Sequence, residues 1–138
     1  MSLRYLSVCS GIEAASVAWQ PLGWQPVAFS EIEPAPCRLL AHHYPDVPNL
    51  GDMTKFQEWP SRDELAIDLL CGGTPCQSFS VAGLRKGLDD PRGNLMLTFG
   101  AIAAKYRPKW LVWENVPGVL SSNGGRDFAA FLDRKSVV

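Results

Sequence analysis

The sequence predicts an α/β fold, in which a doubly wound, mainly parallel sheet carries helices on both of its faces. Short apolar runs that are typical of strands alternate along the chain with segments whose apolar residues recur at helical spacing. Strands that alternate with helices are joined by right-handed crossovers, which place the strands parallel to one another in one sheet. With 138 residues, no internal repeat and no low-complexity tract, the chain fits a single domain.

The first predicted elements are a strand, a helix and a second strand. Residues 4–9 form a short strand pattern that ends at Ser10-Gly11. Ser10 and Glu13 have the spacing of a capping box, which predicts that a helix begins there. Residues 25–32 have the pattern of the second strand. The apolar residues expected on one face of the helix are Ile12, Ala15, Trp19 and Leu22.

A second helix and two further strands are predicted next. Pro34 suits the first turn of a helix. Residues 49–52 are expected to form a third, very short strand, and residues 65–71 (LAIDLLC) have the continuous apolar pattern of a buried strand. The residues at helical spacing after Pro34 are Cys37, Leu40, Ala41 and Tyr44.

The rest of the chain begins with a long segment, residues 72–92, that is rich in Gly, Pro and Ser and has no periodicity. A loop of this length in a compact domain is usually functional. Residues 110–116 (WLVWENV) are expected to form a fifth, buried strand, and residues 124–134 a final helix. The helix between the loop and that strand is marked by Leu95, Phe99, Ile102 and Tyr106.

The composition is that of a soluble globular protein, with 46% hydrophobic and 20% charged residues. The formal net charge of −1 gives no sign of a basic field that would attract nucleic acid. No apolar stretch is long enough to span a membrane and no signal peptide is recognisable, so we expect a cytoplasmic protein. Cys9, Cys37 and Cys71 are interpreted as buried free thiols, and no cysteine–histidine cluster predicts a metal site.

Polar or conformationally unusual residues follow every predicted strand. In a doubly wound sheet, ligands collect at the carboxyl ends of the strands, so these residues predict one site at one edge of the sheet. The alternative is that short polar residues at these positions only terminate strands. This explanation is reasonable for any single position, but it is weaker for all of the positions together. The positions are Ser10-Gly11, Glu31, Asp52, residues 73–80 and Glu114-Asn115.

Two of these residues point to chemistry. Cys76 follows a buried strand, where a thiol is open to a substrate and close to backbone N–H groups that favour the reactive thiolate. Burial is the more common fate of a cysteine, and no histidine is near Cys76 in sequence, which argues against a cysteine protease. Glu114 lies within an apolar strand pattern, where an unpaired buried carboxylate is costly, so a functional role is favoured.

Two motifs resemble those of the DNA cytosine-5 methyltransferases of bacteria and phages. Residues 73–80 (GTPCQSFS) resemble the nucleophile motif of that family, and Glu114-Asn115-Val116 resembles its ENV motif; together they are highly specific. The resemblance is collinear from about residue 6 to residue 127. The weaker matching segments are the glycine turn at Ser10-Gly11-Ile12, the cofactor motifs Glu31-Ile32-Glu33 and Gly51-Asp52-Met53, and residues 90–95 (DPRGNL), similar to the segment after the family's mobile loop.

The resemblance implies a Rossmann-like methyltransferase fold that binds S-adenosylmethionine (AdoMet) and acts on duplex DNA. It implies that Cys76 attacks C6 of a flipped-out cytosine, while Glu114 holds and protonates N3, so that C5 accepts the methyl group. Glu31 is expected to bind the ribose and Asp52 the adenine amino group. Ile32 and Met53 are expected to pack against the faces of the adenine, and Ile12 is also expected to contact the cofactor. The residues expected to line the methionine end are Gly11, Gly73, Pro75 and Leu95. The residues expected to contact DNA or order the loop are Gln77, Ser78, Ser80, Arg92 and Asn115.

The sequence also departs from the family. Glu13 stands in place of the second glycine of the family's Phe-x-Gly-x-Gly turn, and two roles are open for it: a helix cap or a partner of the AdoMet ammonium group. The family's later arginine motif, its target-recognition region and its final cofactor motif have no counterpart. We therefore expect a C-terminally truncated, partial catalytic domain that does not methylate DNA by itself.

Two consequences follow for partners and for function. A complementing C-terminal chain, or self-association through an exposed sheet edge, is expected to accompany such a domain. The main alternative is a non-catalytic remnant that binds AdoMet or a partner. A thiol-dependent redox or hydrolytic enzyme that uses Cys76 is a third, less favoured hypothesis.

Overall fold

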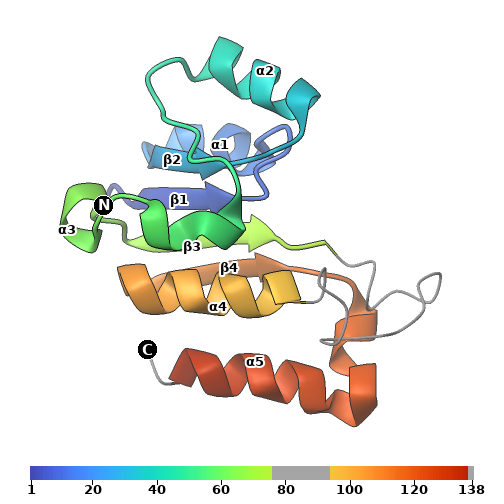
Figure 1. The fold of residues 1–138 in the computed structure, drawn as a ribbon. Coiled ribbons are helices and arrows are strands. Elements are labelled where there is room, and N and C mark those ends of the chain that lie inside the picture. Colours follow the sequence, from blue (N-terminus) through green and yellow to red (C-terminus); the bar gives the residue numbers. More distant parts are fainter. Residues whose placement is uncertain (76–93, 137–138) are drawn as a thin grey trace.

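The computed structural model describes residues 1–75 and 94–136. Within these residues, four strands form one parallel sheet in the order β2-β1-β3-β4. Figure 1 shows the strands side by side, with β2 at one edge and β4 at the other. The strands are β1 (Arg4–Val8), β2 (Gln25–Ser30), β3 (Leu69–Gly73) and β4 (Trp110–Glu114). The predicted parallel α/β fold is confirmed.

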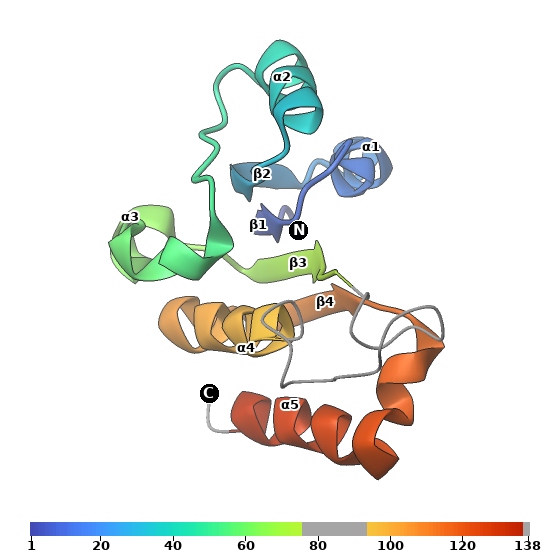
Figure 2. The ribbon, with the colours of Figure 1, turned by 45° about the vertical axis from the view of Figure 1, so that its right-hand side comes forward.

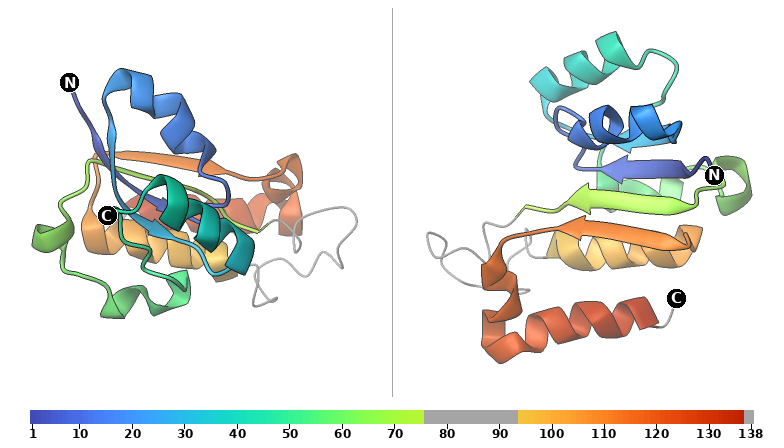
Figure 3. Two further views of the ribbon diagram at one scale, coloured as in Figure 1. Left: turned by 90° about the horizontal axis from the view of Figure 1, so that it is seen from above. Right: turned by 180° about the vertical axis from the view of Figure 1, so that it is seen from behind.

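Helices lie on both faces of the sheet, as a doubly wound fold requires (Figures 2 and 3). One face carries α1 (Ala14–Trp19), and the opposite face carries α4 (Asn94–Tyr106) and α5 (Arg126–Ser136). None of the described helices is long and apolar enough to cross a membrane. The remaining helical elements are η1 (Gln20–Leu22), α2 (Pro34–His43), η2 (Met53–Glu58), α3 (Arg62–Leu65), η4 (Pro117–Leu120) and η5 (Ser122–Gly125).

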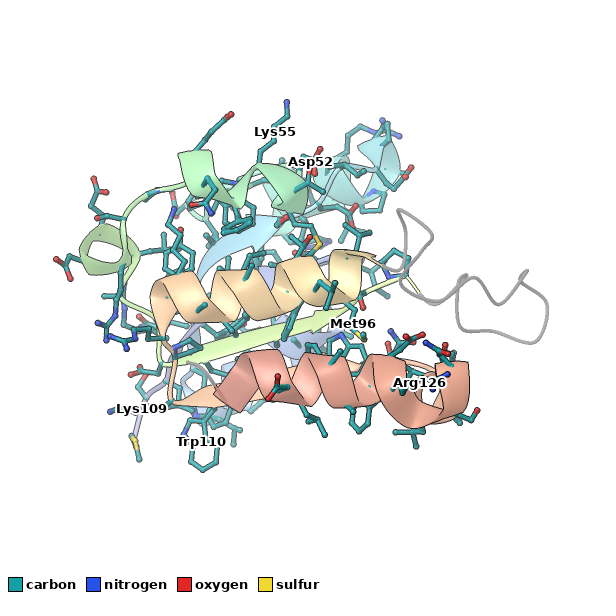
Figure 4. All side chains as sticks on the ribbon, turned by 60° about the horizontal axis from the view of Figure 1, so that its bottom comes forward. Asp52, Lys55, Met96, Lys109, Trp110 and Arg126 are labelled. Carbon is teal, nitrogen blue, oxygen red and sulfur yellow. The ribbon has the colours of Figure 1, made fainter. Side chains whose placement is uncertain are left out.

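The alternation of side chains along β1 divides the core between the two faces. Leu6 and Val8 belong to the larger cluster, which includes buried residues of α4 and α5, among them Met96, labelled in Figure 4. Tyr5 belongs to a smaller cluster with Leu69 and Cys71, against which Trp19 of α1 packs. The larger cluster reaches η2 through Met53, and the Lys105 side chain of α4 fastens the same region by donating hydrogen bonds to the carbonyls of Phe56 (2.8 Å) and Trp59 (2.9 Å).

Two predicted strands are shorter or weaker than expected. Residues 49–52 form a single bridge, Phe29 with Asn49, instead of a third strand, because Gly51 turns the chain with a φ of 76°. The strand expected over residues 65–71 begins only at Leu69. Leu65 instead ends α3, a helix that the sequence analysis missed, although Ser61 and Glu64 form its capping box.

Two predicted helices begin later than expected. The first begins at Ala14, with Glu13 rather than Ser10 at its N-cap. Ile12 and Leu22 therefore lie outside α1 and are exposed, at 71% and 57%. The last helix begins at Arg126, because Gly124 and Gly125 have the positive φ angles of 65° and 86°.

The strand expected to be fully buried near the end of the chain is open on one face. Trp113 packs against Phe128 and Phe131 of α5, but Trp110 and Val112, on the other face of β4, are 62% and 46% exposed. Figure 4 shows Trp110 projecting away from the sheet. In the right panel of Figure 3, no helix of the described part of the chain lies in front of β3 and β4.

Candidate functional site

A cavity of about 250 Å³ lies at the carboxyl ends of β1 and β2, where the sequence predicts a ligand. Most of the residues expected at the adenosine part of a cofactor meet in it, although they come from separate segments of the chain. The predicted residues that line it are Glu31, Ile32, Asp52, Met53, Pro75 and Leu95, together with Cys9, Ser30, Glu33 and Gly51. We refer to it as the first cavity.

Backbone N–H groups hold the Glu31 carboxylate in a fixed position at the end of β2. Its Oε1 accepts a hydrogen bond from the N–H of Gly11 (2.7 Å). Its Oε2 accepts from the N–H groups of Ile32 (2.8 Å) and Glu33 (2.9 Å). A carboxylate has about four acceptor positions, so one remains for a ligand hydroxyl. Gly11 does not line the first cavity; it contributes by orienting Glu31.

Asp52 caps η2 at the opposite wall of the first cavity. Its Oδ1 accepts hydrogen bonds from the backbone N–H (2.9 Å) and the hydroxyl (2.7 Å) of Thr54, and these bonds hold the pKa of Asp52 below its ordinary value. Asp52 and Lys55 of η2 are labelled in Figure 4. The Oδ2 atom of Asp52 accepts no hydrogen bond from another described residue, so it is available to a ligand N–H group.

Apolar side chains form the rest of the first cavity. Ile32 is 65% exposed there, whereas Met53 is 5% exposed and belongs to the core. The Cys9 thiol donates to the sulfur of Met53 at 3.5 Å. Exposed Ile12 and half-buried Gly73 lie outside this cavity. The first cavity thus contains all the residues predicted to contact the adenosine, but only some of those predicted to contact the methionine end.

A second cavity, also of about 250 Å³, lies between α1 and β4 on the opposite face of the sheet. Glu114 lines it at the end of β4 and is exposed, so the expectation of a carboxylate buried in an apolar strand is wrong. Gly73 lies opposite Glu114 in the register of β3 and β4. A Cβ atom at Gly73 would come within 2.6 Å of Glu114 Oε2, so the glycine leaves room for that carboxylate.

Asn115 connects the end of β4 to the segment that leads toward Cys76. Its Nδ2 donates to the carbonyl (3.3 Å) and the hydroxyl (3.2 Å) of Thr74, and its Oδ1 accepts from the N–H of Val116 (2.8 Å). Trp113 Nε1 also donates to the Thr74 hydroxyl at 3.1 Å. This network suits the loop-ordering role expected of Asn115. The expected residues Cys76, Gln77, Ser78, Ser80 and Arg92 lie outside the described residues.

Glu13 caps α1, which is one of the two roles that the sequence left open for it, but it does so from a buried and left-handed position. It is 1% exposed and adopts a left-handed conformation, with a φ of 60°. Its Oε1 accepts from the N–H and the hydroxyl of Ser16, both at 3.2 Å, and that hydroxyl is 2.6 Å from the hydroxyl of Tyr5. Burial raises the pKa of Glu13, and the nearby Ser7 and Ser16 hydroxyls oppose the rise.

Two of the described cysteines, Cys9 and Cys71, do not have the character of nucleophiles. Burial raises the pKa of Cys9 to about 11 and that of Cys71 to about 12. Cys71 is buried as expected, whereas Cys9 and Cys37 are only half-buried. Among the described residues, no group of histidine, cysteine or acidic side chains could hold a metal ion.

Comparisons with known proteins agree with the motifs. Residues 3–135 match the family described as C-5 cytosine-specific DNA methylase. The chain is 53% identical, over 94% of its length, to a protein of Escherichia phage P1 named DNA N-6-adenine-methyltransferase, and 35% identical, over 99%, to the Type II methyltransferase M.AquIA of Picosynechococcus. It spans only 18% and 57% of these two proteins. The matching region is a small part of the phage protein, so the name of that protein describes a much larger molecule than the region that resembles this chain.

A solved structure has the same fold. It is described as a DNA modification methyltransferase encoded within a prophage of E. coli, and it superposes with a TM-score of 0.76. The match covers 98% of this chain and 38% of the other, at 22% sequence identity. At that identity the likeness supports the Rossmann-like fold alone.

Proposed function

The chain belongs to the C-5 cytosine-specific DNA methylase family, and on that premise we propose that it is the AdoMet-binding and nucleophile-bearing part of a DNA cytosine-5 methyltransferase. One observation carries the proposal. Gly73 and Glu114 lie opposite each other at the ends of neighbouring parallel strands, so the segment that leads to Cys76 starts beside the proposed catalytic carboxylate.

The first cavity is the proposed place of the adenosine part of AdoMet, and its side chains fit that group chemically. Glu31 is fixed by backbone donors and can accept a hydrogen bond from a ribose hydroxyl. Asp52 can accept a hydrogen bond from the adenine amino group through Oδ2. Ile32, Met53 and Leu95 provide apolar contacts. A rim carboxylate and an apolar interior are the ordinary composition of a small-molecule site.

The proposed chemistry uses Cys76 and Glu114 on a cytosine flipped out of the duplex. The Cys76 thiolate forms a bond to C6 while Glu114 holds a proton at N3, so electron density from the C5–C6 double bond gathers at C5. Bound AdoMet would supply the methyl group that C5 accepts, as its sulfur–methyl bond breaks and S-adenosylhomocysteine is left. Loss of the C5 proton to water restores the double bond and releases the Cys76 sulfur.

The cofactor part of the proposal is tested by calorimetric titration with AdoMet. We expect one molecule to bind per chain, with Glu31→Gln or Asp52→Asn weakening the affinity about tenfold to a hundredfold, since each removes the negative charge that strengthens the hydrogen bond to the ligand. Thr54→Val is the matched control, because it removes a bond to Asp52 but keeps the carboxylate. Equal affinities in wild type and both carboxamide variants would show that the adenosine lies elsewhere.

The chemical part is tested by incubating the chain, together with a complementing C-terminal part of a methyltransferase of the same family, with AdoMet and DNA that contains 5-fluorocytosine, in which the C5 fluorine blocks release. A covalent product on a denaturing gel should be lost in Cys76→Ala and retained in Cys71→Ala. A product that persists in Cys76→Ala would remove Cys76 from the mechanism. Titratable AdoMet binding without any covalent product would favour the second candidate, an AdoMet-binding domain without catalytic activity of its own.

A further inference from the structure

Glu13 has one oxygen more than its structural role needs. The cap of α1 uses only Oε1, which accepts both hydrogen bonds from Ser16. Oε2 is buried and no hydrogen bond of ordinary length reaches it from the described residues, although the Ser7 and Ser10 hydroxyls lie close enough to the carboxyl group to oppose the rise that burial causes in its pKa. Buried polar atoms are almost always paired, and leaving one unpaired costs about 1–3 kcal/mol. A partner that is not part of the described chain is therefore the simplest explanation of its placement.

The backbone at Glu13 adds a second cost. A φ of 60° places this residue in the left-handed region, which glycine adopts freely and a side chain with a Cβ does not. Glycine is the residue that the family's turn has at this position, so the glutamate is held in a glycine conformation. Strain of this kind collects at functional sites, where it is retained because the side chain does something there.

The surroundings of Glu13 indicate a cationic partner. Glu13 and Glu114 both line the second cavity, and the described residues that line it include no lysine, arginine or histidine. A positively charged group in this cavity would meet two carboxylates and no competing cation. A buried carboxylate that is unpaired is unfavourable, and a hydrogen-bonded cation is the partner that compensates it best.

The two cavities are adjacent, which makes one ligand able to occupy both. Cys9 lines the first cavity and the second. The residues that the resemblance assigns to the methionine end of AdoMet are divided between the cavities: Pro75 and Leu95 line the first, and Gly73 lines the second. A ligand whose adenosine lies in the first cavity therefore extends past Cys9 toward Glu13.

From these observations we infer that Glu13 binds the ammonium group of the amino-acid end of AdoMet, through Oε2, in the second cavity. The inference rests on the proposed function, because it assumes that the adenosine lies in the first cavity. It assigns to this chain a recognition contact that a glycine at this position cannot make. Glu13 thereby has two roles, with Oε1 capping α1 and Oε2 selecting ligands that carry an amino-acid end.

The test compares two ligands that share the adenosine. S-adenosylhomocysteine keeps the ammonium group, whereas 5′-methylthioadenosine lacks the whole amino-acid end. Calorimetric titrations of both are made with the full chain and with Glu13→Gln, which keeps an acceptor for Ser16 and removes the charge. We expect Glu13→Gln to weaken S-adenosylhomocysteine binding about tenfold or more and to leave 5′-methylthioadenosine binding within about twofold.

A second variant separates the carboxylate from the backbone. Glu13→Gly relaxes the left-handed residue and restores the residue type of the family's turn. We expect it to lose the preference for S-adenosylhomocysteine just as Glu13→Gln does, even where its thermal stability differs. Glu58→Gln removes a charge from an exposed residue that lines neither cavity, and as the control it should leave the affinity for both ligands unchanged.

Three results of these titrations would overturn the role proposed for Glu13. Unchanged S-adenosylhomocysteine affinity in Glu13→Gln would overturn the inference and leave the proposed function standing. An equal loss for both ligands would also overturn it, since it would show that Glu13 acts only by shaping the turn. Failure of the wild-type chain to bind either ligand would overturn the inference together with the proposed cofactor site.

Discussion

At the scale of single residues, the local environment makes two of the cysteines, Cys9 and Cys71, hard to ionise. Desolvation raises the pKa of Cys9 to about 11 and that of Cys71 to about 12, well above the value of about 8.5 for a free thiol. The thiolate is the form that reacts with electrophiles. The same environments that keep Cys9 and Cys71 protonated therefore make them unsuitable as nucleophiles.

We predict that iodoacetamide at pH 8 modifies Cys76 faster than Cys9 or Cys71. A pKa of about 11 leaves roughly a hundredfold less thiolate than a free cysteine has at this pH, and a pKa of about 12 leaves less still. Peptide mass spectrometry after timed quenching measures the order, and labelling in urea should equalise the rates. Modification of Cys71 as fast as Cys76 in the folded chain would contradict the assignment of Cys76 as the nucleophile.

Glu13 gives a prediction for stability against pH. Because burial raises its pKa in the folded state, the folded chain holds this proton more tightly than the unfolded chain does. The resulting stabilisation is present below the unfolded-state pKa and is lost as the pH rises through the folded-state pKa. In the ligand-free chain at neutral pH, part of this stabilisation is therefore lost, and a bound cation that pairs with the carboxylate would offset the loss.

We accordingly expect Glu13→Gln to melt at a higher temperature than wild type at pH 7.5, with a difference that shrinks toward pH 4.5. Glutamine resembles the protonated carboxyl group and does not titrate. Circular dichroism melts across this pH range measure the difference, and Glu114→Gln, at an exposed residue of the same cavity, should show little of it. A constant difference at every pH would mean that Glu13 does not titrate in this range.

At the scale of secondary-structure elements, β1 and β3 approach each other closely at the site because Gly72 has no side chain. A Cβ atom there would lie 2.5 Å from Val8 Cγ2 and 2.6 Å from the Val8 carbonyl oxygen. At Gly73 the nearest atom is the carboxylate end of Glu114, which can move aside. Adjacent glycines of β3 therefore have different roles, one in packing and one in leaving room for a functional side chain.

We predict that Gly72→Ala destabilises the chain by about 1–3 kcal/mol, because the backbone of β1 cannot yield, which lowers the melting temperature by several degrees. Gly73→Ala should change the melting temperature little. With 5-fluorocytosine DNA, however, it should reduce covalent product, since Glu114 is displaced. Thermal melts measure the change in stability, and the gel assay measures the covalent product. A similar fall in melting temperature in the two variants would contradict the different roles assigned to Gly72 and Gly73.

The elements that were predicted correctly, and those that were not, differ in what determines them. The existence of β1, β2 and β3 and the meeting of Glu31 with Asp52 in one cavity follow from local pattern and motif order, so the sequence was sufficient for these, although not for the exact bounds of the strands. The exposure of Glu114 was not predictable, because the apolar pattern of β4 does not reveal whether anything covers its second face. Glu13 was misplaced because the Ser10–Glu13 spacing of a capping box does not reveal that Glu13 itself caps α1.

At the scale of the whole molecule, the sheet is unequally covered. The face toward α4 and α5 is packed, whereas the other face of β4 leaves Trp110 and Val112 largely exposed among the described residues. Parallel sheets usually have both faces covered, so this arrangement is unusual. The open face adjoins the second cavity, because Val112 belongs to both. Whatever covers β4 in a longer assembly would therefore also close the site around Glu13 and Glu114.

The charge of the chain predicts weak binding to duplex DNA. Its 13 lysines and arginines are outnumbered by 14 aspartates and glutamates, while the affinity of proteins for DNA comes largely from neutralised phosphates. We expect a dissociation constant weaker than about 10 μM at 150 mM salt and a shallow dependence on salt. Fluorescence anisotropy of a labelled duplex at 50 and 200 mM salt measures both. What binding remains should fall in Arg92→Ala and persist in Arg38→Ala, since Arg38 lies on α2 and is not among the residues expected to contact DNA. Submicromolar affinity with a steep salt dependence would show that the chain holds duplex DNA without help, and that its acidic balance conceals a phosphate-binding surface.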